Sequence, residues 1–315
     1  MTRKVTIIGA GSVGSTIAYT MAVNGLASEI VMIDVNHEKA LGEAMDILQG
    51  TPFCSPIKIY AGSYAEAADS DIVIVTSGVA RKPGQTRIDL AQTNVNIVKA
   101  ITPEITKYAP NAIYIFVANP VDVLTYVFHK ISGIPENRII GSGTILDTAR
   151  LRSRLAELME INQKNVHAYV LGEHGDSSFV PWSCAQIAGV NLDDYRASLN
   201  YAAHEYPDFT YEEVEDYMRT SGAKVISRKG ATFYAVAISV CHIVRTLFSS
   251  VNTVLSVSTM MHGEYGVEDV CISVPTIIGP SGVCGNVLPP LTEEELAKFH
   301  NSANVLKGVI SQLNI

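Results

Sequence analysis

Three residues in the second half of the chain have side chains that could together move a proton and hold an anion. Asp147 and Arg150 stand three residues apart in a segment with helical spacing, so their side chains reach one side of the same turn. His174 follows the strand-like segment 166–171 and lies in the glycine-flanked run 172–176, a turn that can present a side chain to a cleft. Histidine exchanges a proton near neutral pH, a carboxylate orients its ring, and a guanidinium pairs with carboxylates. The three residues predict a proton relay beside a site for an acid.

Taken singly, two of these residues also suit ordinary structural roles. Asp147 could cap a helix, and Arg150 could be a solvated surface arginine. The histidine favours the chemical interpretation, because a Gly-Glu-His-Gly-Asp turn exposes its central side chain instead of packing it in a core.

A glycine-rich loop near the N-terminus has the spacing of a dinucleotide site. The loop lies between a strand-like and a helix-like segment and reads Gly9, Ala10, Gly11, Ser12, Val13, Gly14. Gly9 allows a tight turn, Gly11 lets the backbone approach a pyrophosphate, and Gly14 lets the helix pack on the sheet. The helix N-terminus, with Ser12 and Val13 in its first turn, offers free N–H groups to the anion. The alternative is a glycine turn before an ordinary core helix.

Asp34 ends the next strand-like segment, where an acidic residue completes the dinucleotide pattern. Its carboxylate can accept hydrogen bonds from both ribose hydroxyls and would repel a 2′-phosphate. No arginine follows it at positions 35–37. The loop and the acid together predict NAD, and not NADP, as the cofactor.

Strand-like and helix-like segments alternate through the first part of the chain. The strand-like segments are 5–8, 30–33, 72–76 and 113–117, and helical spacing is found at 12–24, 37–48 and 146–161. Such alternation predicts βαβ units and a parallel sheet. We therefore expect an α/β protein with an N-terminal Rossmann dinucleotide-binding domain, residues 1–142, and a C-terminal mixed α+β substrate domain, residues 143–315.

Composition narrows the classes of partner and location. The 315 residues carry 23 Lys and Arg against 31 Asp and Glu, a net charge of −8, which argues against nucleic acid or an anionic membrane surface as a partner. The 5 cysteines are scattered and form no C-x-x-C pair, which predicts reduced thiols and a cytoplasmic protein. The apolar segment 233–248 contains His242 and Arg245 and is too polar for a membrane span. No metal site is expected.

Three motifs give the chain a specific resemblance that runs from end to end. They are Ala-Asn-Pro-Val-Asp at 118–122, Gly-Ser-Gly-Thr-Ile-Leu-Asp-Thr-Ala-Arg at 141–150 and Leu-Gly-Glu-His-Gly-Asp at 171–176. The chain resembles the L-lactate/L-malate dehydrogenase family and is closest in its motifs to the bacterial L-lactate dehydrogenases. The resemblance implies an NAD-dependent L-2-hydroxy acid dehydrogenase acting on a small 2-oxo or 2-hydroxy acid.

The same resemblance implies a role for each site residue. His174 would be the acid/base, oriented by Asp147, and Arg150 would hold the substrate carboxylate by a two-point pair. Arg87 would lie on a mobile lid and polarise the reacting carbonyl. Asn119 would hydrogen-bond near both the nicotinamide and the substrate.

The resemblance divides on the substrate. Arg81 stands where lactate enzymes usually carry glutamine, and an arginine there is the malate pattern, because it can pair with the second carboxylate of oxaloacetate. Other positions instead resemble the lactate enzymes, namely Glu173, the run 181–183 and Thr232. Of these, Thr232 would line the substrate site. Arg81 could also face solvent or pair with a protein carboxylate, which would leave pyruvate as the substrate. We therefore expect an L-lactate dehydrogenase, with L-malate dehydrogenase as the alternative.

A regulatory site is also implied. In similar bacterial lactate dehydrogenases the positions of Arg152 and His167 bind fructose 1,6-bisphosphate across a subunit interface, and Arg152 faces away from Arg150 on the helix. We accordingly expect a homo-oligomer, with a tetramer favoured, activated by the bisphosphate. The alternative for this pair is a surface arginine and a strand histidine.

Two other classes are compatible with the dinucleotide loop. An NAD-dependent glycosidase needs a metal site, usually with a cysteine beside the Asn-Pro turn, but here Ala118 precedes Asn119. A non-catalytic NAD sensor would not need the whole set of Arg87, Asp147, Arg150 and His174. Metal-independent NADH oxidation would separate both from a dehydrogenase.

Overall fold

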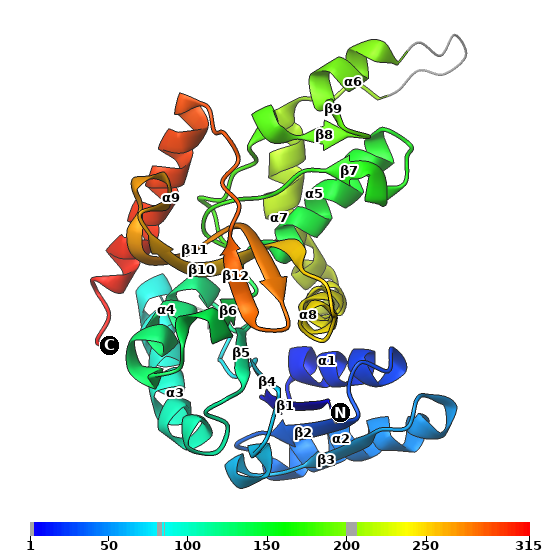
Figure 1. Cartoon of the computed structure of the whole chain (residues 1–315), viewed down its shortest axis with the longest axis vertical. Helices are drawn as coiled ribbons and strands as arrows, with labels where there is room; N and C mark the ends of the chain where they lie inside the picture. The colour runs from blue at the N-terminus through cyan, green and yellow to red at the C-terminus, as the bar shows by residue number, and fades with distance from the viewer. Residues whose placement is uncertain (1–2, 81–83, 85, 200–206) are drawn as a thin grey trace.

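A computed structural model describes residues 3–80, 84, 86–199 and 207–315 of the chain (Figure 1). Its main sheet has nine strands in the order β12-β11-β10-β6-β5-β4-β1-β2-β3. The parallel part consists of β3 (Lys58–Ala61), β2 (Glu29–Ile33), β1 (Lys4–Ile8), β4 (Ile72–Val75), β5 (Ile113–Phe116) and β6 (Ile139–Gly141). This order reverses between β1 and β4, which makes the carboxyl ends of these two strands the expected place for a ligand.

Helices cover both faces of the parallel strands, as Figure 1 shows. They are α1 (Ser12–Val23), α2 (His37–Gly50), α3 (Arg87–Tyr108) and α4 (Val121–Ser132). The central strands β4 and β5 are buried on both faces, and their alternate side chains enter two different cores. Val73, Val75, Tyr114 and Phe116 join the core under α3 and α4, while Ile72, Ile74, Ile113 and Ile115 join the core under α1 and α2.

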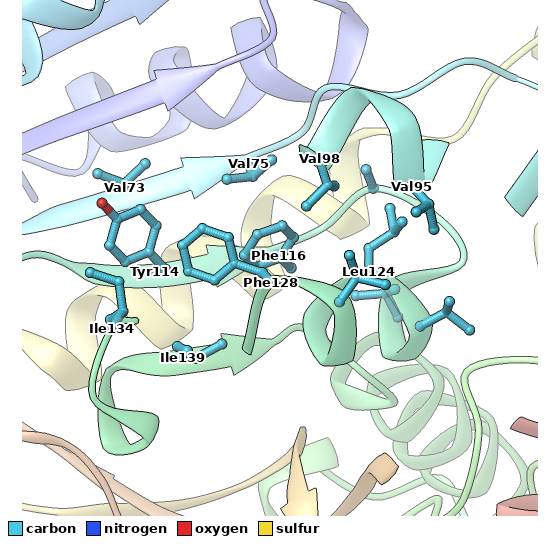
Figure 2. Close-up of a cluster of buried hydrophobic side chains, with 14 of the residues drawn as sticks. Val73, Val75, Val95, Val98, Tyr114, Phe116, Leu124, Phe128, Ile134 and Ile139 are labelled. Atoms are coloured by element: carbon cyan, nitrogen blue, oxygen red, sulfur yellow. The ribbon is translucent and has the colours of Figure 1, made fainter. Parts of the chain in front are cut away.

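Aromatic rings fill the core on the α3 and α4 side. Figure 2 shows Tyr114 and Phe116 of β5 beside Phe128 of α4, with Val73 and Val75 above them. The ring centroids of Tyr114 and Phe116 lie 4.7 and 4.8 Å from that of Phe128. This packing fixes α4 against the sheet, and α4 begins directly after the Asn119–Pro120 peptide.

The C-terminal half adds an antiparallel extension and a separate helical layer. Strands β10 (Thr253–His262), β11 (Glu268–Gly279) and β12 (Gly282–Asn286) continue the main sheet from β6. The remaining elements are α5 (Ile145–Leu158), β7 (Val166–His167), β8 (Gln186–Ile187), β9 (Val190–Asn191), α6 (Leu192–Ser198), α7 (Tyr211–Lys229), α8 (Tyr234–Leu247) and α9 (Glu293–Ile310). Strands β7, β8 and β9 form a small sheet of their own.

The predicted fold class is confirmed, with differences in detail. The dinucleotide-binding part is a mostly parallel, two-sided sheet, and the second part mixes helices with antiparallel strands. The main sheet continues through strand pairs contributed from both sides of residue 142, so the division at 142/143 stays a prediction. Short 3-10 turns connect several elements. Among the described residues, no helix is both long and apolar enough to cross a membrane.

Candidate active site

The glycine loop lies at the carboxyl end of β1, where the strand order reverses. Gly9 has φ +108, a left-handed conformation that favours glycine, and Thr76 after β4 donates a hydrogen bond to its carbonyl oxygen at 2.9 Å. A Cβ on Gly14 would lie 1.9 Å from that same oxygen, so the helix contacts the strand only because residue 14 has no side chain. A Cβ on Gly11 would meet no atom within 4 Å. Gly11 therefore faces open space, as backbone that approaches a ligand must.

The two glycines predict opposite consequences of adding one methyl group. Gly14→Ala forces α1 away from Gly9 and should lower the free energy of unfolding by roughly 1–3 kcal/mol, as overpacking does. Gly11→Ala should leave the unfolding temperature unchanged and raise the Kd for NADH by about tenfold or more, equivalent to ~1.4 kcal/mol. Thermal unfolding and NADH fluorescence titration measure both. A Gly11→Ala protein with normal NADH affinity would contradict the assignment of this loop.

Asp34 accepts hydrogen bonds from the backbone of the glycine loop and of the residues after β2. Its Oδ2 accepts from the Ala10 N–H at 2.7 Å, and its Oδ1 accepts from the Asn36 N–H at 2.9 Å. A nearby cavity of about 350 Å³ is lined by residues that include Val13, Thr76 and Asn119. The Asp34 carboxylate suits an adenosine ribose, and the open backbone at Gly11 suits a pyrophosphate at the helix N-terminus. The cavity suits a nicotinamide. The residues present therefore suit NAD.

The structure brings His174, Asp147 and Arg150 into direct contact. His174 Nδ1 lies 2.5 Å from Asp147 Oδ2, and Arg150 Nη1 donates to Asp147 Oδ1 at 2.9 Å. Asp147 is only 6% exposed. Since Nδ1 faces the carboxylate, Nε2 is the ring nitrogen left to exchange a proton with a substrate. Both side chains of the helix do reach one side of its first turn, as their spacing predicts.

The charges of this trio shift the pKa values of His174 and Asp147. The Asp147 carboxylate raises the pKa of His174 to about 9, against the opposing effect of burial. Burial alone would raise the pKa of Asp147, but the adjacent His174 and Arg150 hold it below its ordinary value. The imidazole is therefore a cation at neutral pH, ready to donate a proton, and the carboxylate stays ionised to orient it.

Hydrogen bonds to the backbone fix both segments that carry the trio, helix α5 and the histidine turn. Thr144 precedes α5, and its hydroxyl donates to the carbonyl of Val170 at 2.6 Å, which ties the helix to the segment before the histidine turn. Gly172 exchanges backbone hydrogen bonds with Ser273 of β11 at 3.1 Å. The α7 backbone approaches Arg150 at Gly222, where an added Cβ would lie 3.4 Å from the guanidinium. The arginine is enclosed by protein and keeps 17% exposure of its side chain.

Arg87 meets the histidine turn from the other side. It is the first residue of α3, and its Nη2 lies 2.5 Å from Oδ2 of Asp176, two residues beyond His174. Its side chain is 73% exposed, so this pair is solvated and leaves the guanidinium free to exchange partners. Arg81, the residue on which the substrate prediction divides, lies outside the described residues.

Asn119 is linked to the loop that follows β4 through a residue that sequence reasoning missed. The Asn94 side chain of α3 donates to the Asn119 carbonyl at 2.7 Å and accepts from the Val79 N–H at 2.9 Å. Asn94 is buried in a helix where apolar residues would be expected. A buried amide flanked by Val95 and Val98 of the core was the available signal.

Three other predicted residues stay apart from the trio. Thr232 is half-buried in the loop between α7 and α8. His167 lies exposed on β7, and Arg152 donates to the carbonyl of its neighbour Ala168 at 2.9 Å. Arg152, half-buried on α5, therefore contacts the residue next to His167. Within the described part of the chain, no group of three or more His, Cys, Asp or Glu is arranged to hold a metal ion.

Comparison with known proteins assigns the chain to a family. Residues 3–141 match the lactate/malate dehydrogenase NAD binding domain, and residues 144–314 match the lactate/malate dehydrogenase alpha/beta C-terminal domain. The chain is 46% identical to an L-lactate dehydrogenase of Thermoanaerobacter sp. over 99% of this chain and 100% of that one. It is also 46% identical to L-lactate dehydrogenase 1 of Clostridium acetobutylicum, over 98% of both.

Solved structures agree with these sequence matches. The crystal structure of the minor L-lactate dehydrogenase from Enterococcus mundtii, in its ligand-bound form, aligns with a TM-score of 0.94 at 38% identity, covering 100% of this chain and 99% of that one. NAD is the cofactor, as the glycine loop and Asp34 predict and the matched NAD binding domain confirms. The chain belongs to the lactate/malate dehydrogenase family.

Proposed function

We propose that this chain is an NAD-dependent L-lactate dehydrogenase that interconverts pyruvate and L-lactate. The observation that carries the proposal is the contact of His174, Asp147 and Arg150, which places a charged imidazole beside an anchor for a carboxylate. The relatives named L-lactate dehydrogenase support it, since they match over nearly the whole length of both chains.

The proposed reduction uses each side chain at a stated atom. Bound as NADH, the cofactor would supply the hydride that the substrate C2 carbon accepts. Arg150 pairs with the substrate carboxylate, and His174 donates the Nε2 proton to the C2 oxygen. Arg87 leaves Asp176 and polarises that oxygen as charge develops on it. Asn119, which lines the cavity, would hydrogen-bond near both the nicotinamide and the substrate.

Arg81 is the residue that leaves the choice between pyruvate and oxaloacetate open, and we propose pyruvate. If Arg81 paired with a second carboxylate, its loss would cost roughly 2–5 kcal/mol of binding to oxaloacetate. We expect the native protein to prefer pyruvate in kcat/KM, and Arg81→Gln to change pyruvate reduction by less than about threefold, under ~0.7 kcal/mol. Steady-state NADH oxidation with both keto acids measures this. A preference for oxaloacetate that Arg81→Gln abolishes would make the protein a malate dehydrogenase instead.

Apolar surface supports a homo-oligomer, of which a tetramer is proposed. Large apolar side chains are exposed on α2 and α8, among them Leu41, Met45, Leu48, Tyr234 and Ile238.

Arg152 and His167 are the proposed binding residues for fructose 1,6-bisphosphate. Arg152 also lines a cavity of about 300 Å³ with Lys164, so two cationic side chains face it, while burial and nearby arginines lower the pKa of His242 in the same lining. Sedimentation velocity and pyruvate saturation curves with and without the bisphosphate test both proposals. A cytoplasmic location stays a prediction from the scattered cysteines, all of which are free.

A further inference from the structure

Asp122 is a buried carboxylate behind the acid/base that the reaction described above does not use. It stands in the first turn of α4, three residues after Asn119, and is 2% exposed. Its Oδ2 accepts a hydrogen bond from the backbone N–H of His174 at 2.8 Å. Asp122 therefore links the start of α4, next to Asn119, to the backbone of His174.

The surroundings of Asp122 stabilise its ionised carboxylate only in part. Its Oδ1 has no hydrogen-bond partner among the described residues, and the Ser258 hydroxyl of β10 beside it makes no well-aligned hydrogen bond either. A buried ionised group with an unpaired oxygen is costly. An asparagine would keep the acceptor for the His174 N–H and could donate to Ser258.

We propose that Asp122 is a positioning residue for the acid/base: from α4 it fixes the backbone of His174 and adds a second negative charge behind the imidazole. The proposal rests on the proposed role of His174. Asp147 holds the ring at Nδ1, and Asp122 holds the main chain of the same residue, so the imidazole is fixed at two points.

The charged groups around Asp122 come from several elements. His174 and Glu173 face it from the histidine turn, and Cys271 faces it from β11. Burial raises the pKa of Asp122 to about 6, opposed by the Ser258 hydroxyl, by the His174 N–H and by the His174 charge, while Glu173 adds to the rise. The helix N-terminus favours the ionised form. At neutral pH Asp122 is thus an anion and raises the pKa of His174, in addition to the larger effect of Asp147 and against that of Arg150.

The first experiment titrates His174 directly by NMR in the protein without cofactor or substrate, assigned by comparison with His174→Asn. We expect Asp122→Asn to move the titration midpoint to lower pH by ~0.5 or more, since an anion is replaced by a neutral group. Asp269→Asn is the matched control. Asp269 is an exposed carboxylate that pairs with Lys130 of the same helix α4, and its loss should leave the midpoint unchanged.

The second experiment follows pyruvate reduction against pH for the same variants. Asp122→Asn should keep kcat within about threefold at low pH, where His174 is protonated, and lose activity at a lower pH than the native protein. Asp122→Ala should lose a further ~10-fold in kcat at every pH, because the backbone anchor is gone. If Asp122→Ala does not fold, Asp122→Asn carries the test alone.

The two proposals fail in different ways. A native protein that does not reduce pyruvate would overturn the proposed function, while the NMR titration would still test Asp122. A His174 midpoint that coincides in native and Asp122→Asn protein would overturn the role of the Asp122 charge. Asp122→Ala with native kcat would overturn its role as an anchor.

Discussion

His174→Asn is expected to lower kcat for pyruvate reduction by roughly 10²–10⁴-fold, the contribution of a well-placed general acid. Asparagine can still donate to Asp147 in place of Nδ1, so the pair with the carboxylate is kept and only the proton at Nε2 is lost. The unfolding temperature should therefore change little. Stopped-flow NADH oxidation at saturating pyruvate measures the effect.

The matched control is a histidine that also pairs with a carboxylate but lies on the surface. His262→Asn removes a ring whose Nε2 contacts Glu136 Oε1 at 2.5 Å and whose side chain is 62% exposed. This variant should retain native kcat. A His174→Asn protein that loses less than about tenfold, below the range of general acid catalysis, would remove His174 from the reaction.

The direction of the pH dependence follows from the raised pKa of His174, about 9. Pyruvate reduction needs the protonated imidazole, so kcat/KM should be level below that pH and fall as pH rises through about 9. Lactate oxidation needs the neutral imidazole, so its kcat/KM should rise over the same interval. Asp147→Asn removes the largest cause of the raised pKa and should move both midpoints to lower pH. Midpoints that stay in place would show that another group titrates.

The same pKa has a consequence for stability. His174 in the folded protein binds its proton more tightly than an unfolded histidine with a pKa near 6.5. Its contribution to the free energy of unfolding is therefore fully present below pH ~6.5 and is lost as pH rises through the folded value. Loss of pyruvate reduction and loss of stability in alkali thus share one cause, and the NMR titration of His174 distinguishes this cause from general unfolding.

Much of the site could be predicted because its determinants are local. The glycine spacing of 9–14 reflects contacts within one βα turn, and the three-residue spacing of Asp147 and Arg150 fixes their side on a helix. The parallel strands β1, β2, β4 and β5 were predicted from continuous β-branched runs, although β1 and β2 begin one residue earlier than predicted, whereas β3 and β6 were not predicted. Helix α5 ends at Leu158, short of the predicted Ile161.

What could not be predicted depends on contacts between distant segments. The segment 166–171 was predicted as one strand, but β7 stops at His167, because the backbone of Leu171 pairs with Phe179 instead. The continuation of the main sheet by β10 depends on a pairing of Ser258 with Gly141, far away in sequence. Strand pairing of this kind leaves no local pattern.

The roles of two buried polar residues were missed for the same reason. Asp122 was noted only as part of a motif, and its partner is the backbone of His174, 52 positions later. Asn94 lies in a helix among core valines, and its partners are Val79 and Asn119. A polar residue in a helical pattern is conspicuous, but its function is defined by what it contacts in the folded chain.

Arg150→Lys is expected to raise KM for pyruvate by roughly 30- to 4000-fold, equivalent to losing one partner of a buried charge pair worth 2–5 kcal/mol. Lysine keeps the positive charge but cannot make a two-point contact, and its shorter reach must serve both Asp147 and the substrate. Because α7 encloses the guanidinium at Gly222, water cannot readily replace the lost hydrogen bond. KM should rise more than kcat falls, since the carboxylate is held in ground and transition states alike.

The helix that carries Arg150 also supplies its control. Arg154 pairs with Glu157 at 2.8 Å with the same three-residue spacing, but Glu157 is 65% exposed and the pair is solvated. Arg154→Lys should therefore leave KM and kcat at native values, since exposed pairs contribute little.

Steady-state kinetics of both variants, measured with pyruvate and with the uncharged pyruvate amide, completes the test. Only pyruvate should discriminate native protein from Arg150→Lys, because the amide has no carboxylate to pair. An Arg150→Lys protein that loses both substrates equally would place the arginine in the support of Asp147 and not in substrate binding.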